Sequence, residues 1–391
     1  MIKRNGLLSF ILFVSLVFQA QSQSANVTQR ISEKIQAYID SLQKANGFPG
    51  TSVTVILPSR EPISFAAGVS NKETGAAMKP GSLMLSGSTG KMYFAILTML
   101  LVQDGKLSLD DKVEKYLGKN GWYKRVPNAS QITIQQLLNH TTGIEEYYEL
   151  GDFIERLKKE VEKEWKPEEL IAYVFDRKPL FVAGNGFGYA DTNYLILGMV
   201  LEELLGIKAY DEINRRIISP LGLASTQPSI KRQIKGLITG YSWPELPTKI
   251  DGAVVKNGNL VINPQFEWGG GGFASNTIDL ATLVSTLMHY RPVKKNLVEE
   301  MKQAVDAPAL GQGQQYGLGL QIMPTKWGKS YGHSGWFPGY MSDVQYVPEI
   351  DVTVAIQFNT DDFRLTKGHP RKYVHKIFDL VMEELKNNTD N

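Results

Sequence analysis

The chain of 391 residues contains no cysteine. This absence excludes disulfides, thiolate metal sites, a cysteine nucleophile and lipid attachment to cysteine. Only five histidines are present, and none of them has a ligand spacing such as His-Glu-x-x-His, so we expect no metal and no cofactor. Forty-two basic residues nearly balance forty acidic ones. Because the excess of +2 forms no basic block, the sequence predicts no surface for nucleic acid.

Long apolar runs are also scarce. The run Leu7 to Phe18 follows Lys3 and Arg4 and precedes Ala20-Gln21-Ser22, a small-residue pattern that a signal peptidase reads. We therefore interpret residues 1–22 as a signal peptide and predict export, to a bacterial periplasm or the medium, which suits a chain without disulfides. No later stretch is long or apolar enough to predict a stable membrane span after cleavage.

Periodicity predicts strands at both ends of the chain and helices between them. Isoleucines at helical spacing come first, then two strand-like runs joined by a turn, and Leu107 to Gly222 is mostly helical. We expect Thr277 to cap a helix over Ile278 to Met288. The closing elements are predicted as strands Tyr316 to Met323, Tyr340 to Val347 and Val352 to Phe358, with a helix from Tyr373 to Leu385.

This order of elements predicts an α/β (α+β) fold in one domain, residues 29–386, followed by a polar tail over 387–391. An antiparallel sheet built from both chain ends would be flanked by helices, with a mostly helical lobe inserted between its halves. We assign the sheet lobe to about 29–90 and 270–386, and the helical lobe to about 91–269.

The stretch Leu85 to Lys91 is the candidate reactive centre. An apolar run follows it, so we expect a buried helix that starts near Ser88, whose N-terminus favours an anionic oxygen. Lys91 lies one turn later on the same face, and a desolvated lysine can lose its proton near neutral pH and activate a serine hydroxyl. The pattern Ser-x-x-Lys is weak alone, because Ser41 and Lys44 match it on an amphipathic helix that we expect to be exposed.

A working site also needs donors for an oxyanion and a proton shuttle. Tyr189-Ala190-Asp191 follows a glycine-rich loop at the start of a helix, so its phenol could point into a cleft. Gly332 to Trp336 precedes the strand expected at Tyr340, where an edge can offer backbone groups to a substrate. A Ser-His-Asp site on His333 and Ser334 is disfavoured, because adjacent residues of a strand point to opposite faces.

The ordered set of these motifs resembles the serine β-lactamase and penicillin-binding-protein superfamily. It is most similar to the branch with class C β-lactamases, D,D-carboxypeptidases and related esterases. The matching phrases span nearly all of the mature chain: Ser88-x-x-Lys91, Leu137 to Gly143, Tyr189 to Tyr194, Gly270 to Ser275 and Gly332 to Tyr340.

The resemblance implies a β-lactamase/transpeptidase-like fold and a role for each motif. Ser88 would be the acylated nucleophile, Lys91 its proton acceptor, and Tyr189 the base and acid that also activates water. The backbone N–H groups of Ser88 and Trp336 would form the oxyanion hole. The triplet His333-Ser334-Gly335 would stand where the family has Lys-Thr-Gly, with its first two side chains at the substrate carboxylate.

Two departures from the family pattern bear on the chemistry. Asp191 replaces an asparagine, and its carboxylate would stabilise protonated Lys91, which shifts the role of base toward a Tyr189 phenol whose pKa the lysine lowers. His333 replaces a lysine and would attract a carboxylate less strongly. We read His140 and Asn193 as structural residues.

These features predict an exported serine hydrolase that acts through an acyl-enzyme on a D-amino-acid peptide, as a D,D-carboxypeptidase or peptidase would, or on an ester. The alternatives are a class C-like β-lactamase and a catalytically silent sensor of peptidoglycan or β-lactams. The expected partner is a small molecule, peptide or ester, with peptidoglycan and β-lactams among the candidates.

Overall fold

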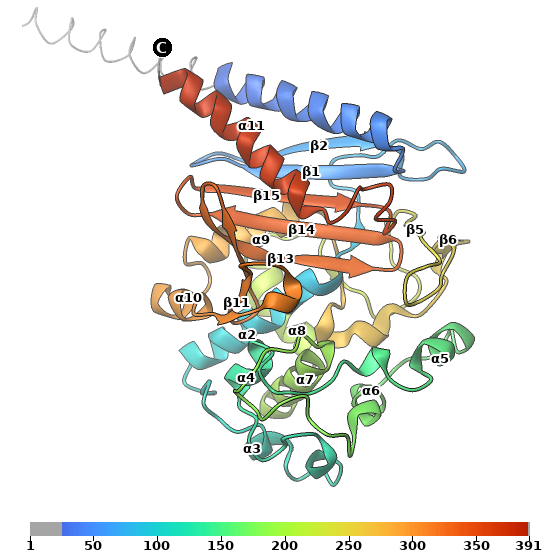
Figure 1. The fold of residues 1–391 in the computed structure, drawn as a ribbon, viewed down its shortest axis with the longest axis vertical. Coiled ribbons are helices and arrows are strands. Elements are labelled where there is room, and N and C mark those ends of the chain that lie inside the picture. The colour runs from blue at the N-terminus through green and yellow to red at the C-terminus, as the bar shows by residue number, and fades with distance from the viewer. Residues whose placement is uncertain (1–25, 390–391) are drawn as a thin grey trace, which may run out of the picture.

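The computed structural model describes residues 26–389 and is built on an eight-stranded antiparallel sheet (Figure 1). The strand order is β10-β11-β12-β13-β14-β15-β1-β2, so β1 pairs with the last strand of the chain and β2 follows at the edge. This order confirms the predicted sheet from both chain ends. The signal peptide predicted for residues 1–22 lies outside the described residues. The strands are β1 (Gly50–Ile56), β2 (Ile63–Gly68), β10 (Val305–Asp306), β11 (Gln315–Tyr316), β12 (Gln321–Thr325), β13 (Gly328–Phe337), β14 (Tyr340–Val347) and β15 (Val352–Phe358).

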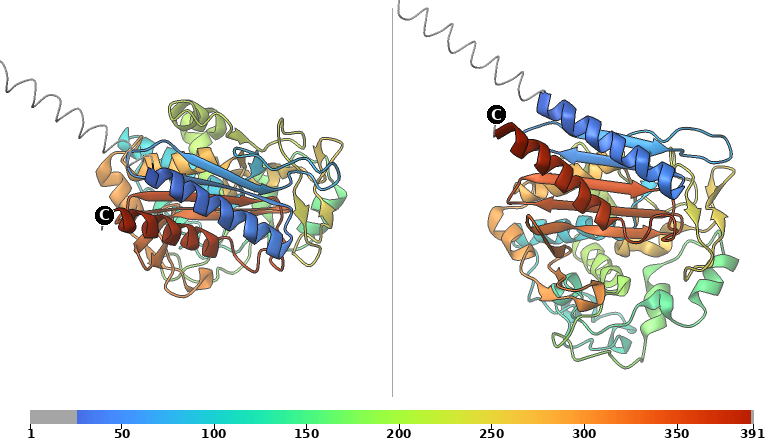
Figure 2. Two further views of the ribbon diagram at one scale, coloured as in Figure 1. Left: turned by 90° about the horizontal axis from the view of Figure 1, so that it is seen from above. Right: turned by 45° about the horizontal axis from the view of Figure 1, so that its top comes forward.

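Two helices cover one face of this sheet, one over residues 26–46 and the other α11 (Arg371–Thr389) (Figures 1 and 2). Ile31, Ile35 and Ile39 are fully buried, because a spacing of four residues places them on one side of the first helix. They join apolar side chains of α11 and of the sheet in a core of their own. Helices from the two ends of the chain therefore form one layer that covers this face of the sheet.

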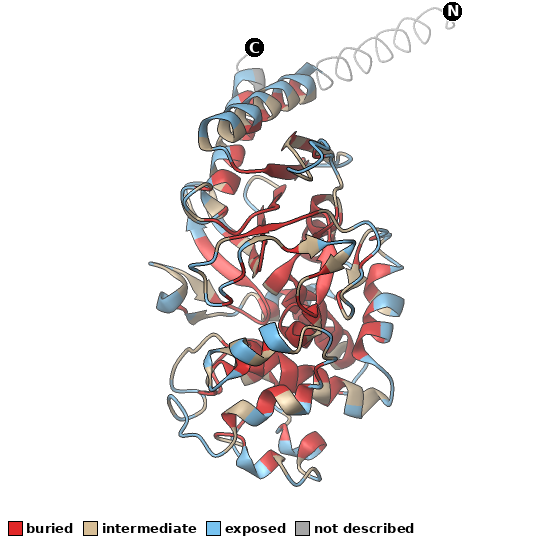
Figure 3. Ribbon diagram, turned by 90° about the vertical axis from the view of Figure 1, so that its right-hand side faces the viewer, coloured by how far each residue is buried: buried red, intermediate tan, exposed pale blue. Residues whose placement is uncertain are grey.

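The opposite face of the sheet carries the larger core. The helix α9 (Thr277–Met288) packs there against β1, β14 and β15. Beyond it lie α2 (Lys91–Gln103), which is buried from Lys91 to Leu101, and α7 (Asp191–Leu205). Figure 3 shows this buried interior running from the sheet into the helical lobe. Because α2 is buried from Lys91 to Leu101, its N-terminal end is packed between the sheet and the lobe.

The rest of the helical lobe is made of short elements. Over residues 26–389, no helix is both long enough and apolar enough to cross a membrane. Besides α2 and α7 the helices are α3 (Glu114–Leu117), α4 (Ile134–Leu138), α5 (Phe153–Lys159), α6 (Pro167–Ile171) and α8 (Ala209–Ile213), with α10 (Lys295–Met301) beside the sheet. The short strands are β3 (Met84–Leu85), β4 (Gln227–Pro228), β5 (Tyr241–Ser242), β6 (Gly252–Ala253), β7 (Val255–Lys256), β8 (Asn259–Leu260) and β9 (Phe273–Ser275).

Several element boundaries differ from the prediction. The single strand expected over Tyr316 to Met323 is two strands, β11 and β12, because the chain turns between them with Gly319 at φ +75°. The cap of α9 is Asn276, whose side chain accepts the N–H of Asp279, so Thr277 is the first helical residue. The helix α11 continues to Thr389, past the expected end at Leu385.

The largest difference is β13. His333, Ser334 and Gly335 are expected to precede the strand at Tyr340 as a short edge, and they lie inside a ten-residue strand. The strand pairs with β14 over Tyr331 to Phe337, whereas β12 covers its other edge only from Gly328 to Gly332. Within residues 26–389, no strand therefore pairs with the second half of β13 on the edge that β12 leaves open.

Candidate active site

Ser88 lies where the chain leaves the short strand β3 and enters α2. The first turn, Gly87–Gly90, is a 3₁₀ helix, so the predicted helix start near Ser88 is confirmed with a tighter opening turn. Gly90 allows this turn to pass the glycine-rich segment, because an added Cβ would lie 1.7 Å from the carbonyl oxygen of Gly271. Ser88 is half-buried and lines a pocket.

Lys91 is fully buried beneath Ser88. Its Nζ donates to Ser88 Oγ at 3.1 Å, to Asp191 Oδ1 and to the carbonyl oxygen of Gly270. Burial lowers the pKa of Lys91, but Asp191 and Tyr189 outweigh burial and raise it above the usual value. The expectation that desolvation frees this lysine of its proton is therefore wrong for the resting site, whereas the expected pairing with Asp191 is present.

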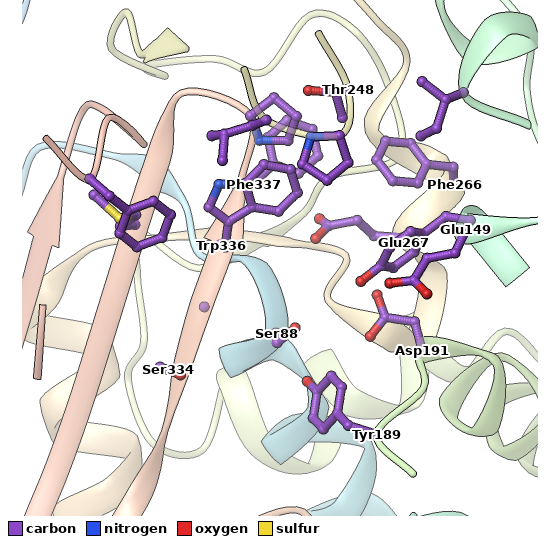
Figure 4. A pocket seen from close by; sticks show the side chains of 18 of the residues that line it. Ser88, Glu149, Tyr189, Asp191, Thr248, Phe266, Glu267, Ser334, Trp336 and Phe337 are labelled. Carbon is purple, nitrogen blue, oxygen red and sulfur yellow. The ribbon is translucent and has the colours of Figure 1, made fainter. Parts of the chain in front are cut away.

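Tyr189 stands just before α7, and its side chain faces Ser88 (Figure 4). The ammonium of Lys91 lies 4.8 Å from the centre of the Tyr189 ring. Burial raises the pKa of the phenol to about 12, although the charge of Lys91 and hydrogen bonds to Lys91 and Ser88 act in the opposite direction. The predicted lowering by Lys91 exists, but burial exceeds it, so Tyr189 is protonated in the resting site at neutral pH.

The unpaired half of β13 runs directly past Ser88. An added Cβ on Gly335 would lie 1.9 Å from the Ser86 carbonyl oxygen and 3.1 Å from the Ser88 backbone nitrogen. One on Gly87 would lie 2.6 Å from the Trp336 backbone nitrogen. Only glycine permits this approach, which brings together the two backbone groups expected to form an oxyanion hole.

The side chains of His333 and Ser334 are engaged within the protein. His333 is fully buried, with Nε2 2.8 Å from the Tyr316 hydroxyl and Nδ1 2.6 Å from the Ser334 carbonyl oxygen. Burial lowers the pKa of His333 to about 3, with Lys91 adding to the effect. A neutral, enclosed imidazole does not reach a substrate carboxylate, so the expected contact is corrected to a supporting position behind Ser334. Ser334 and Gly335 do line the pocket.

Two buried carboxyl groups near Lys91 were not singled out from the sequence. Glu146 accepts the backbone N–H of Asp191 through Oε2, while its Oε1 is buried without a hydrogen-bond partner. Burial, and then the charge of Asp191, raises the pKa of Glu146 well above its usual value and that of Glu267 to about 8. Glu267 lies two residues before the glycine run at 269–272, and this proximity in sequence was the one available signal.

The pocket in front of Ser88 has a volume of about 360 Å³. Figure 4 shows the carboxyl groups of Glu149, Asp191 and Glu267 pointing into it, across from Ser334. The far part is aromatic, with the Phe266 and Phe337 rings stacked at 5.8 Å. Among the described residues that line this pocket there is no lysine or arginine; the lining set also includes Tyr148, Phe153, Ile154, Leu157, Leu246, Gln321, Trp336 and His369.

His140 and Asn193 have the structural contacts expected of them. His140 is fully buried, and its Nδ1 accepts the backbone N–H of Ala190 at 3.2 Å and lies 3.1 Å from Asn193 Nδ2. The Asn193 oxygen accepts the Thr142 hydroxyl at 2.6 Å. Because the His140 ring lies 4.3 Å from that of Tyr189, this group fixes the phenol in place. The second Ser-x-x-Lys match is exposed on the first helix, at Ser41 and Lys44.

Known proteins share both the sequence pattern and the fold. The family model described as Beta-lactamase matches residues 35–374. Penicillin-binding protein 4 of Amycolatopsis lactamdurans is 26% identical over 85% of this chain and 88% of its own length. Teichoic acid D-alanine hydrolase of Staphylococcus aureus is 27% identical over 89% of this chain and 78% of its own length.

Among solved structures, a D-stereospecific amidohydrolase from a Streptomyces species has a TM-score of 0.73 at 26% identity, covering 85% of this chain and 96% of that one. A D-amino acid amidase from Ochrobactrum anthropi has a TM-score of 0.75 at 23% identity, covering 92% and 99%, and shows the same fold. With a family match over most of its length, a serine and a tyrosine in one pocket and a buried lysine that donates to that serine, this chain belongs to the beta-lactamase family of serine hydrolases.

Proposed function

We propose that this enzyme hydrolyses an amide or ester whose acyl part is a D-amino acid with a free ammonium group. The observation that carries the proposal is the lining of the pocket, which has three carboxyl groups on one wall and no lysine or arginine among its described lining residues. Asp191 is already paired with Lys91, and Glu267, with its pKa raised to about 8, becomes a full carboxylate when a cation binds beside it. Carboxylates bind an ammonium group through charge-assisted hydrogen bonds. The aromatic end of the pocket offers room for an apolar side chain of the substrate.

The reaction would proceed through an acyl-enzyme on Ser88. The Lys91 and Tyr189 unit holds its protons tightly at rest, so the reactive form is the one that has lost a single proton. Ser88 Oγ then attacks the carbonyl carbon, its proton passes to this unit, and the N–H groups of Ser88 and Trp336 stabilise the oxyanion. The proton moves on to the leaving amine or alcohol. Water repeats the sequence, releasing the acid and restoring the hydroxyl.

The charge pattern separates the two substrate classes expected from the sequence. A D,D-carboxypeptidase must hold the C-terminal carboxylate of its substrate, which calls for a cation at the β13 edge. His333 is buried there, with both ring nitrogens in contact with neighbouring groups, and the guanidinium of Arg371 already donates to the Gln321 side-chain oxygen. Hydrolysis of an ester or amide therefore has more support than carboxypeptidase activity. The proposed D-configuration is supported by the names of two relatives, a D-stereospecific amidohydrolase and a D-alanine hydrolase.

We also propose that the enzyme is exported. The support is the basic pair Lys3 and Arg4, the apolar run Leu7 to Phe18 and the small residues that follow. Mass spectrometry of the protein recovered from a bacterial periplasm or medium tests this, since cleavage near Ser22 would remove the predicted segment. A mature protein that retains Met1 to Ser22 would contradict it.

A substrate panel tests the proposed reaction. We expect hydrolysis of D-alanine p-nitroanilide and D-phenylalanine amide, little reaction with the L-enantiomers, and loss of activity in Ser88→Ala. Acetylation of the substrate amine should lower kcat/KM by at least about tenfold, because a hydrogen bond to a charged group contributes about 1.5–3 kcal/mol. Glu267→Gln should reduce the difference in kcat/KM between the free and the acetylated amine, chiefly by raising KM for the free amine.

The outcomes separate the parts of the proposal. Equal hydrolysis of the free and acetylated amines would refute recognition of the ammonium group while leaving the acyl-enzyme intact. Activity that survives Ser88→Ala would refute the mechanism. A stable penicillin adduct on Ser88, with no turnover of any member of the panel, would favour the sensor.

A further inference from the structure

Gln321 has an unusual set of contacts at the β13 edge. It is the first residue of β12, it pairs with Gly332, and its side chain is buried while lining the pocket. Its amide oxygen accepts the Ser334 backbone N–H at 3.1 Å, the Ser334 hydroxyl at 3.0 Å and Nη2 of Arg371. Three donors, one of them a guanidinium, therefore meet at a single neutral oxygen.

This donor set suits a carboxylate better than an amide. A carbonyl oxygen offers two lone pairs, whereas a carboxylate offers about four acceptor positions and pairs with guanidinium by charge. Arg371 is held in place from its other side by Asp343, which is fully buried and lies 3.1 Å from Nε. His369, which also faces Asp343, is neutral because burial lowers its pKa to about 4. Among the described residues, the guanidinium is thus the one cation of the group formed by Gln321, Asp343, His369 and Arg371.

We infer that Gln321 occupies, from within the chain, the position that a substrate carboxylate would take beside Ser334, and that it thereby selects against carboxylate-bearing substrates. An incoming carboxylate has to displace the amide oxygen from all three donors before it can bind. The inference rests on the proposed acylation of Ser88, and it gives Gln321 a role in specificity rather than in the chemical steps. It explains why Ser334 can lie in the pocket and still not be available to such a substrate.

The test compares benzylpenicillin with its methyl ester, which differs only by masking the carboxylate. For each variant, the second-order rate of acylation of Ser88 is measured by intact mass, and the ratio of acid to ester is taken. Gln321→Ala should raise this ratio at least tenfold over wild type. Gln321→Glu is the matched control, since it keeps an acceptor of the same size on the three donors, and its ratio should not rise. The double variant Gln321→Ala with Arg371→Gln should lose the gain.

Gln321→Ser provides the same comparison if the alanine variant does not fold. A ratio that stays at the wild-type value in a folded Gln321→Ala or Gln321→Ser enzyme overturns the inference, as does an equal rise in Gln321→Glu. Failure of the proposed function looks different, because then neither penicillin nor the D-amino-acid amides would acylate Ser88 in any variant.

Discussion

Replacing Asp191 by asparagine should move the pH dependence of this enzyme to lower pH. The carboxylate accepts a hydrogen bond from Lys91 and is buried with it, so the substitution removes a negative charge while keeping the size of the side chain. Two unit charges about 4 Å apart attract by about 4 kcal/mol at an effective dielectric constant of about 20. Because about 1.4 kcal/mol changes an equilibrium tenfold, even a third of this attraction matters for the proton on Lys91.

The sign follows from the proton count. Asp191 raises the pKa of Lys91, and in the proposed mechanism the reactive form of the Lys91 and Tyr189 unit has lost one proton, so kcat/KM of the wild type should climb with pH above neutrality. In Asp191→Asn the lysine releases its proton more readily. The rising limb of the plot of kcat/KM against pH should therefore move down by at least about one pH unit.

Glu267 is expected to oppose part of this shift. Burial, and then Asp191, raises the pKa of Glu267 to about 8, so loss of the Asp191 charge lets Glu267 ionise at lower pH and restore some negative charge near Lys91. The double variant Asp191→Asn with Glu267→Gln should therefore move the limb further than Asp191→Asn alone.

The assay is kcat/KM for D-alanine p-nitroanilide across the neutral and alkaline range, with folding checked by melting temperature. Asp111→Asn is the matched control, because Asp111 pairs with a lysine on the exposed surface, 2.9 Å away, and should leave the profile unchanged. A limb that stays in place or moves up in folded Asp191→Asn would refute the assignment of Lys91 and Tyr189 as the titrating unit.

Three further substitutions test the surroundings of the site. The wild type should lose stability as pH rises from about 5 to 8, because the buried Glu267 carboxyl keeps its proton in the folded state while it ionises freely in the unfolded chain. Glu267→Gln does not titrate, so its melting temperature should rise relative to that of the wild type over this pH range. A difference in melting temperature that stays constant with pH would contradict this. Trp268 has φ 41° and ψ −127°, yet Trp268→Gly should unfold at lower denaturant, since loss of a buried tryptophan, about 3–5 kcal/mol, exceeds relief of about 1–3 kcal/mol of strain. Gly335→Ala should lower kcat/KM at least about a hundredfold by pushing β13 off Ser88. Gly121→Ala should leave kcat/KM unchanged, because an added Cβ at Gly121 would have no atom within 4 Å.

Local patterns account for what could be predicted of the site. Ser88 and Lys91 are one turn apart on the same chain segment, so their contact depends on helix geometry alone. The sheet from both chain ends followed from the distribution of strand-like and helical periodicity. Tyr189 and Asp191 lie next to each other in sequence, and the resemblance to a known family supplied their approach to Ser88, which no local rule could give.

The full length of β13 could not be predicted, because its glycines meet the needs of a distant packing contact and lower the propensity of the segment to form a strand. Glycine disfavours a strand, and Gly332 and Gly335 both interrupt this one. Gly335 is required because the strand passes against Ser86 and Ser88, far away in sequence. The buried carboxyl groups could not be predicted either, because the pKa values of Glu146 and Glu267 are raised by burial and by the charge of Asp191. Neither cause is visible in a list of residues.

The ion pairs around the pocket decide which charged substrates it accepts, while the catalytic serine, lysine and tyrosine stay the same. The charge of Lys91 is balanced by Asp191, and that of Arg371 by Asp343. Glu149 and Glu267 have no ion-pair partner among residues 26–389, so the pocket keeps two carboxyl groups that no basic side chain pairs with, although Glu267 holds its proton up to a pKa of about 8. The ammonium group of a substrate would bind to these carboxyl groups. Its positive charge would lower the pKa of Glu267, so that the Glu267 carboxyl loses its proton. Selection would then depend on the pocket walls rather than on the nucleophile, which is why substitutions at Glu267 and Gln321 should change substrate choice while Ser88 stays indispensable.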